Sequence, residues 1–113
     1  MTATESNSYT NIVLKFILNA LKNGTLDTHL LQIPPEYVDI IQKIAQSADE
    51  TAKIKARVVH NSYGAVNSID RQVFLSNVEK SPEWMHEMLI ALYNGADNDT
   101  IYKMVIDYML KEL

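Results

Sequence analysis

Histidine and acidic side chains are the groups of this sequence best suited to chemistry, and their spacing can be compared with that of known sites. The three histidines are His29, His60 and His86, and no two of them are three or four residues apart. Because positions three or four apart share one helix face, no histidine pair can hold a metal ion on a helix. His86-Glu87 matches the start of a zinc-protease signature, but Ile90 stands where the second histidine is needed. We therefore expect no metal site and no cofactor.

Three carboxylates near the end of the chain are the next candidates: Asp97, Asp99 and Asp107. Paired acids can act as general acid and base when burial separates their pKa values. Acidic residues also stabilise the first turn of a helix, so we interpret these three as a helix cap and a solvated face. Ser81 has no base placed beside it by any motif, which favours a helix cap over a nucleophile. The sequence therefore predicts a protein that is not an enzyme.

Composition places the chain among ordinary globular proteins. It has 113 residues, of which 47% are hydrophobic and 21% charged, enough for a single core. The absence of cysteine excludes disulfides and fits a cytoplasmic location. The apolar run 12–18 is interrupted by Lys15 and is interpreted as a buried helix, so no signal peptide or membrane segment is expected. A net charge of −4 argues against a protein that binds nucleic acid unaided, because lysine and arginine supply most non-specific affinity.

Periodicity and capping signals predict an all-α fold, a compact bundle of about five to six short helices. Residues 1–9 are polar and are expected to form a flexible N-terminus, which leaves 10–113 as a single helical domain. The first helix runs from Thr10 to about Lys22, where Gly24 stops it. A short helix follows Thr25 and ends before Pro34-Pro35. A third covers 35–46, with an apolar stripe of either Val38, Ile41 and Ala45 or Tyr37, Ile41 and Ile44.

The second half of the chain continues this pattern. Asp49 can cap a helix through Val58, although the alternation over 53–59 also suits a strand; we favour the helix. A turn is expected over 61–64, followed by a helix capped by Asn67 or Ser68. Ser81-Pro82-Glu83 begins the next helix, and Gly95 ends it. Asp97 or Asn98 then caps a final helix to about residue 109.

Residues 85–109 carry a helix-turn-helix pattern. Ala91, Gly95, Ile101 and Met104 fall where that motif needs a small residue, a turn glycine and two apolar anchors. Two core helices joined by a glycine turn would show the same pattern. As a helix-turn-helix, the segment would present polar residues of its second helix to DNA, supported by a basic patch that is otherwise a solvated face. The DNA-binding candidates are Thr100, Tyr102, Lys103, Lys53, Lys55, Arg57 and Arg71.

A second candidate surface centres on Trp84, with Met85 and Met88 beside it. Tryptophan is enriched at binding hot spots, and methionine suits adaptable partner surfaces. Both residue types also fill cores, so the same stretch can serve packing alone. We take Trp84, Met85 and Met88 as a candidate interface with a partner protein.

One family resemblance covers residues 12–46. Leu21-Lys22-Asn23-Gly24, then the segment from Leu30 to Glu36, then Ile40-Ile41, resembles the N-terminal part of FlhD-like regulators of conjugative elements. The stretch 47–64 departs from that family, which has a leucine-rich connection there. The resemblance implies a helical subunit that activates transcription together with a more basic, FlhC-like partner. The matching positions look structural, and none of them is implied to contact DNA: Leu21, Gly24, Leu31, Pro35, Glu36 and Ile41.

Two functional hypotheses follow. The first is a DNA-associated regulatory subunit of transcription that acts as a homo- or hetero-oligomer or through a basic partner protein. The second is a small acidic inhibitor or adaptor, of phage or immunity type, that blocks a target protein. Asp97, Asp99 and Glu83 would then carry the acidic contact surface. Neither hypothesis involves a small-molecule substrate.

Overall fold

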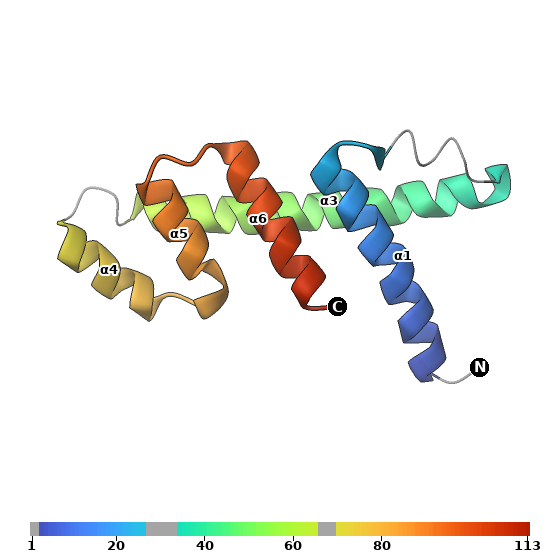
Figure 1. The fold of residues 1–113 in the computed structure, drawn as a ribbon, viewed down its shortest axis with the longest axis horizontal. Helices are drawn as coiled ribbons and strands as arrows, with labels where there is room; N and C mark the ends of the chain where they lie inside the picture. The colour runs from blue at the N-terminus through green and yellow to red at the C-terminus, as the bar shows by residue number, and fades with distance from the viewer. Residues whose placement is uncertain (1–2, 27–33, 66–69) are drawn as a thin grey trace.

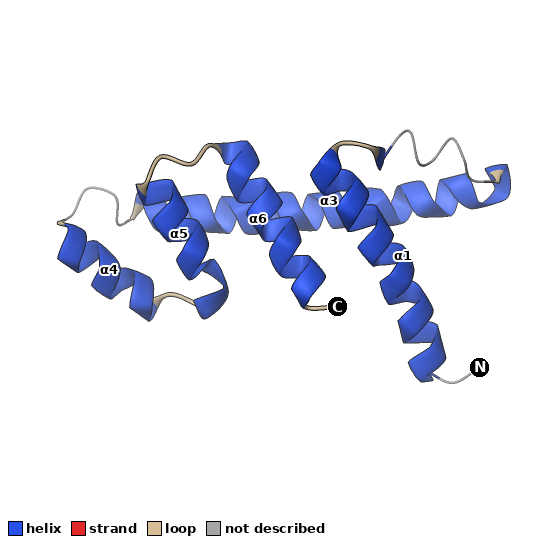
Figure 2. Ribbon diagram, viewed as in Figure 1, coloured by secondary structure: helices blue, strands red, loops and turns tan. Residues whose placement is uncertain are grey.

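A computed structural model describes residues 3–26, 34–65 and 70–113, and in this part of the chain every regular element is a helix (Figure 2). The all-α prediction is confirmed, and the segment 53–59, open between helix and strand, is helical. The short helix predicted after Thr25 and the cap predicted at Asn67 or Ser68 lie almost wholly outside the described residues. The elements are α1 (Ala3–Asn23), α3 (Pro35–Gly64), α4 (Arg71–Lys80), the short 3-10 helix η1 (Glu83–Met85), α5 (His86–Tyr93) and α6 (Asn98–Lys111).

Helix α3 is the frame of the molecule. It begins at Pro35, whose missing N–H costs nothing in a first turn, and continues for 30 residues. The sequence predicted a break near residue 47 and a turn over 61–64, and both predictions are wrong. Asp49 is inside the helix, where Lys53 pairs with it at 2.9 Å, so a residue interpreted as a cap forms an i,i+4 ion pair instead.

Helix α1 starts earlier than predicted. The helix includes residues from Ala3 onward, so the predicted start at Thr10 is wrong. Its end was predicted correctly, because Gly24 adopts φ +70° and Thr25 N–H donates to the Ala20 carbonyl. Ile17 and Leu18 are fully buried, which fixes one side of α1 against the rest of the molecule.

Helices α5 and α6 form the hairpin expected around Gly95, which has φ +95°. Asp97 caps α6, since its Oδ1 accepts a hydrogen bond from Thr100 N–H at 2.8 Å. This bond also lowers the pKa of the Asp97 carboxyl. Ser81 does not cap the start of the next helix, so this prediction is wrong: it is the C-cap residue of α4, and its hydroxyl donates to the Asn77 carbonyl.

The helices are arranged in two layers, with α1, α6 and α5 crossing one side of α3 (Figure 1). The molecule measures 54 × 31 × 15 Å, so it is long and thin, and α3 spans most of its length, with α4 beyond one end (Figure 1). Small residues recur every three or four positions on the inner side of α3 and let the crossing helices approach closely. These buried residues are Ala45, Ala48, Ala52, Ala56 and Val59.

Aromatic contacts attach α4 to this frame. The Phe74 ring, 1% exposed, stacks on Tyr93 of α5 with 4.6 Å between the centroids. It also meets the edge of Tyr63 from α3 at 6.5 Å. None of the helices in the described ranges combines the length and apolar character needed to span a bilayer.

Candidate functional site

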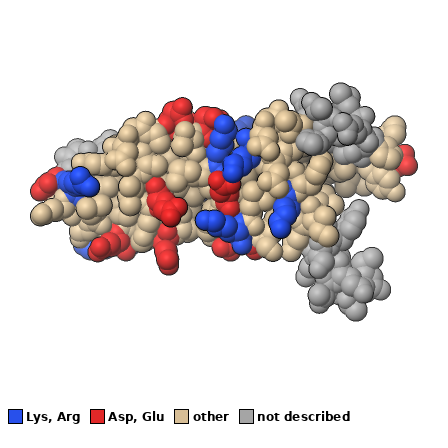
Figure 3. All heavy atoms as spheres, in the orientation of Figure 1, with Lys and Arg blue, Asp and Glu red and all other residues tan. Residues whose placement is uncertain are grey.

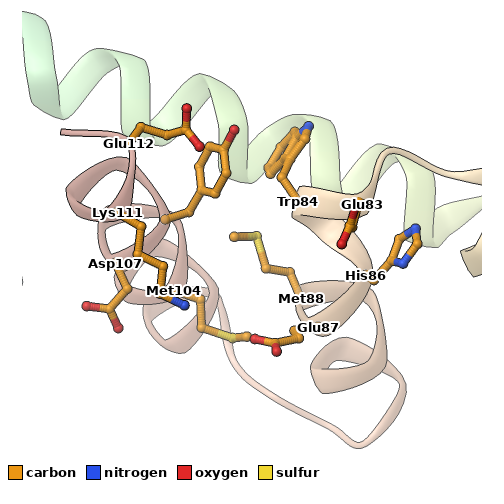
Figure 4. Close-up of a pocket in the computed structure, with 10 residues that line it drawn as sticks. Glu83, Trp84, His86, Glu87, Met88, Met104, Asp107, Lys111 and Glu112 are labelled. Atoms are coloured by element: carbon orange, nitrogen blue, oxygen red, sulfur yellow. The ribbon is translucent and has the colours of Figure 1, made fainter.

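A groove of about 770 Å³ opens between the turn that leads into α5 and the second half of α6. Figure 4 shows Met88 reaching from α5 towards α6, with Trp84 and Met104 on either side of it. Carboxylates and a lysine surround these apolar groups. The lining residues are Glu83, Trp84, His86, Glu87, Met88, Met104, Asp107, Tyr108, Lys111 and Glu112.

The aromatic wall of the groove joins three helices. The Trp84 and Tyr108 rings have centroids 5.4 Å apart and are tilted by 32°. Lys55 of α3 places its ammonium 5.1 Å from the Trp84 centroid and 5.7 Å from that of Tyr108. A cation held over two ring faces limits their movement. Lys55 therefore joins α3 to the aromatic wall.

The rim of the groove is acidic. Figure 3 shows carboxylates over the turn into α5 and mixed charges along α6. Four rim residues are acidic, whereas Lys111 is the single lysine of the lining, and Asp107 is paired at 2.5 Å with Lys22 of α1. The rim therefore favours positively charged ligands. Its carboxylates are Glu83, Glu87, Asp107 and Glu112.

His86 is the one lining residue with an imidazole ring, which is suited to proton transfer, and one of its ring nitrogens is engaged in a hydrogen bond within the protein. Its Nε2 lies 2.7 Å from the Ser81 carbonyl, so this nitrogen carries the proton and donates it. Within the described residues no three acidic or histidine side chains gather as metal ligands. The arrangement of the groove suits binding, through apolar contact below and charge at the rim.

The candidate partner residues divide between the groove and the core. Trp84 is half-buried and lines the groove, as Met88 does while remaining 3% exposed. Met85 is 1% exposed and belongs to the core cluster. Helix η1 turns the Met85 side chain inward and Trp84 towards the groove, and an interface role for Met85 stays a prediction.

The DNA-contact residues predicted on α6 do not form one open surface. Tyr102 donates a hydrogen bond of 2.5 Å to Asp49 Oδ1 on α3, so its hydroxyl faces the protein. Burial and this bond both raise the pKa of the Tyr102 phenol. Lys103 pairs with Asp99 at 3.1 Å, and Thr100 is exposed beside the capping aspartate. A base contact by Tyr102 stays a prediction, and it would require the hydroxyl to leave Asp49.

The predicted basic patch is also divided. Lys53 pairs with Asp49, and Lys55 lies over the aromatic wall. Arg57 is exposed on α3, and Arg71 is exposed at the start of α4. The two arginines stand on different helices, while both lysines already have partners. The helix-turn-helix itself stays a prediction, since α6 uses Ile101, Val105 and Ile106 to pack in the core.

Sequence reasoning missed the far wall of the groove. Met104 was expected as an apolar anchor of the last helix, and neither Tyr108 nor Glu112 was among the interface candidates. The available signal was spacing, because 104, 108 and 112 lie four residues apart and share one face of a helix. What the sequence does not give is that this face meets Trp84.

The three acidic residues interpreted as structural have structural contacts: Asp97 caps α6, Asp99 pairs with Lys103, and Asp107 pairs with Lys22.

Comparison with models of protein families, with curated proteins and with solved structures finds no match to this chain. The resemblance to FlhD-like regulators therefore stays a prediction.

Proposed function

We propose that the protein is a non-enzymatic binding module that holds a basic, amphipathic segment of another protein in the groove between α5 and α6. The observation that carries this proposal is the combination of an aromatic and methionine wall with an acidic rim. An amphipathic helix binds by laying its apolar face into such a groove, and its lysines or arginines then meet the rim. Methionine side chains adapt to the shape of what enters.

This proposal develops the inhibitor or adaptor hypothesis. A role in transcription would run through the same groove, with a basic DNA-binding protein as the partner. Direct DNA binding has less support, because the candidate cations are spread over α3, α4 and α6 and the chain has a net charge of −4. The phosphate contacts that non-specific affinity requires would come from the partner.

Trp84 is the single tryptophan of the chain and lines the groove, so its fluorescence reports directly on occupancy. We would titrate the protein with an 18-residue helical peptide of leucine and lysine, and with a matched peptide of leucine and glutamate. The basic peptide should change the Trp84 emission and the acidic one should not. Charge reversal by Glu83→Lys with Glu87→Lys should weaken basic-peptide binding by about tenfold or more, because like charges then meet at the rim.

Glu79→Lys is the matched control, since Glu79 is exposed on α4 outside the groove lining. It makes the same charge change as either single reversal, Glu83→Lys or Glu87→Lys, with which it is compared, and should leave the affinity within about twofold. Equal weakening by Glu79→Lys would mean that the peptide senses only net charge, and the groove would lose its role. No emission change with either peptide would also contradict the proposal.

The class of partner can then be read from recovery out of host lysate with the wild-type chain and the Glu83→Lys, Glu87→Lys variant. A basic protein retained only by the wild type identifies the partner. If promoter DNA accompanies that protein and is lost after nuclease treatment, the transcription role is supported. If the partner is retained without DNA, the inhibitor or adaptor role is supported.

A further inference from the structure

The side of α3 turned away from the core carries large apolar side chains in water. Tyr37, Ile40, Ile54 and Val58 have exposed fractions of 54%, 56%, 57% and 44%. The half-buried Ile44 and the exposed Ser47 and Thr51 lie in the same stripe. The seven positions 37, 40, 44, 47, 51, 54 and 58 follow one another at alternating intervals of three and four residues. This is the heptad spacing of a helix that pairs with another helix. We call these seven residues the outer stripe.

A row of charges borders the outer stripe. Glu36, Lys43, Glu50 and Arg57 are each seven residues after the last, alternate in sign and are all exposed. They occupy the heptad position next to the stripe, where charged side chains determine which helix is accepted as a partner and in which direction it runs. The signs of these four charges can therefore indicate whether the helix that covers the stripe runs parallel or antiparallel to α3.

We propose that a second copy of this chain covers the outer stripe, with the two α3 helices antiparallel about a twofold axis. In that arrangement Glu36 lies opposite Arg57 of the second copy, and Lys43 lies opposite Glu50 of the second copy. The twofold axis repeats both pairs, so every charge of the row meets its opposite. A symmetric dimer needs one surface that complements itself, and the row has this property.

The same register aligns the apolar residues. Tyr37 packs beside Ile54 of the second copy, and Ile40 beside Thr51. The layer nearest the axis is Ile44 with Ser47. In these two inner layers a smaller side chain, Ser47 or Thr51, meets an isoleucine, whereas the outer layer pairs the two larger residues.

In a parallel dimer the row of charges would face uncharged residues. In parallel pairs each charge meets the residue five positions further along the partner helix. For Glu36 and Lys43 those residues are Ile41 and Ala48, which are uncharged, and Ala48 is buried in the core of its own chain. The antiparallel arrangement is therefore the one that the sequence of α3 supports.

Local contacts leave the row available. Lys43 pairs with Asp39 at 3.3 Å, but both side chains are about 75% exposed, so the ion pair is weak and the lysine can turn to a partner. Gln46 reaches Glu50 at 3.5 Å, a long hydrogen bond.

A charge swap tests the pairing by sedimentation equilibrium. Glu36→Lys alone and Arg57→Glu alone should each weaken dimerisation by about tenfold, because like charges then face each other twice. Combining the two substitutions in one chain restores opposite charges and should return the constant to within about threefold of wild type. Arg71→Glu on α4 makes the same charge change away from the stripe and should have no effect. Circular dichroism checks that each variant stays helical.

Cysteine cross-linking tests the direction, since the chain has no cysteine of its own. A mixture of Tyr37→Cys and Ile54→Cys chains should form disulfide-linked dimers, and neither chain should do so alone. In the antiparallel register the two copies of position 37 are separated by about 26 Å, because 17 residues rise by 1.5 Å each. Cross-linking of Tyr37→Cys with itself would indicate a parallel dimer and overturn the proposal. A wild-type chain that stays monomeric at high micromolar concentration, or a double variant as weak as the single ones, would overturn it equally.

Discussion

The two sides of α3 differ in a way that composition alone would not suggest. The inner side, which is buried, consists almost entirely of alanine, whereas the outer stripe contains isoleucine, tyrosine and valine that are about half exposed. Small residues stand where α1, α5 and α6 pack against the helix, and large ones stand where no described part of the chain covers them. On this helix small side chains therefore stand where a neighbouring backbone is close. The large, exposed side chains of the outer stripe provide a surface on which another helix could pack.

A large residue placed on the inner side tests whether that side of α3 is closely packed, and it should have the largest effect of the substitutions considered. Ala52 is fully buried at the centre of the alanine face. Ala52→Leu should lower the free energy of unfolding by about 1–3 kcal/mol, because the added atoms force the crossing helices apart. Urea denaturation followed by circular dichroism measures the change.

Gln42→Leu is its control, since Gln42 is exposed on the same helix and gains the same side chain. It should alter stability by no more than about 0.5 kcal/mol. If Ala52→Leu were equally harmless, the inner side would be loosely packed, and the contrast between the two sides of α3 would fail.

Alanine also explains which parts of the fold could be predicted from the sequence. The stops at Gly24 and Gly95 and the cap at Asp97 are local, so backbone chemistry is enough to predict them. The continuity of α3 through Asp49 is not local. Its buried residues there are weakly hydrophobic alanines, which a search for an apolar stripe overlooks, and only the packing of other helices shows that they are core.

The candidate site divides in the same way. Trp84 and Met88 could be selected from the sequence because their residue types are typical of interfaces. Tyr108 could not be joined to them, because the crossing of α5 and α6 depends on contacts far apart in the sequence. The same holds for Tyr102, whose polar hydroxyl suggested an exposed residue until Asp49 proved to be its partner.

A smaller effect is expected at that polar contact on the border of the inner side. Tyr102→Phe removes the hydrogen bond to Asp49 and should cost about 1 kcal/mol at pH 7. Burial raises the pKa of the Asp49 carboxyl, but the hydrogen bonds from Tyr102 and Lys53 outweigh it, so the folded pKa lies below 3.8. The stabilisation is therefore present above the unfolded pKa and is lost as the pH falls through the folded one.

Denaturation of wild type and Tyr102→Phe at pH 7 and at pH 2.5 tests this sign. The difference between the two proteins should shrink in acid, where Asp49 becomes protonated and accepts a weaker bond. A difference that grew in acid would mean that the phenol stabilises the neutral carboxyl, and the assigned contact would be wrong.

The smallest effect is expected on the outer stripe. Ile54 is 57% exposed, and serine has a similar helix propensity, so Ile54→Ser should change the stability of dilute, monomeric protein by less than about 0.5 kcal/mol. The dependence of Tm on protein concentration distinguishes substitutions on the two sides of α3. If a second copy covers the stripe, the Tm of the wild type rises with protein concentration because association stabilises the folded state. Ile54→Ser should abolish that rise, whereas Ala52→Leu lowers the Tm at every concentration. A wild-type Tm that is independent of concentration would leave the outer stripe exposed in solution, and its large side chains would need another partner.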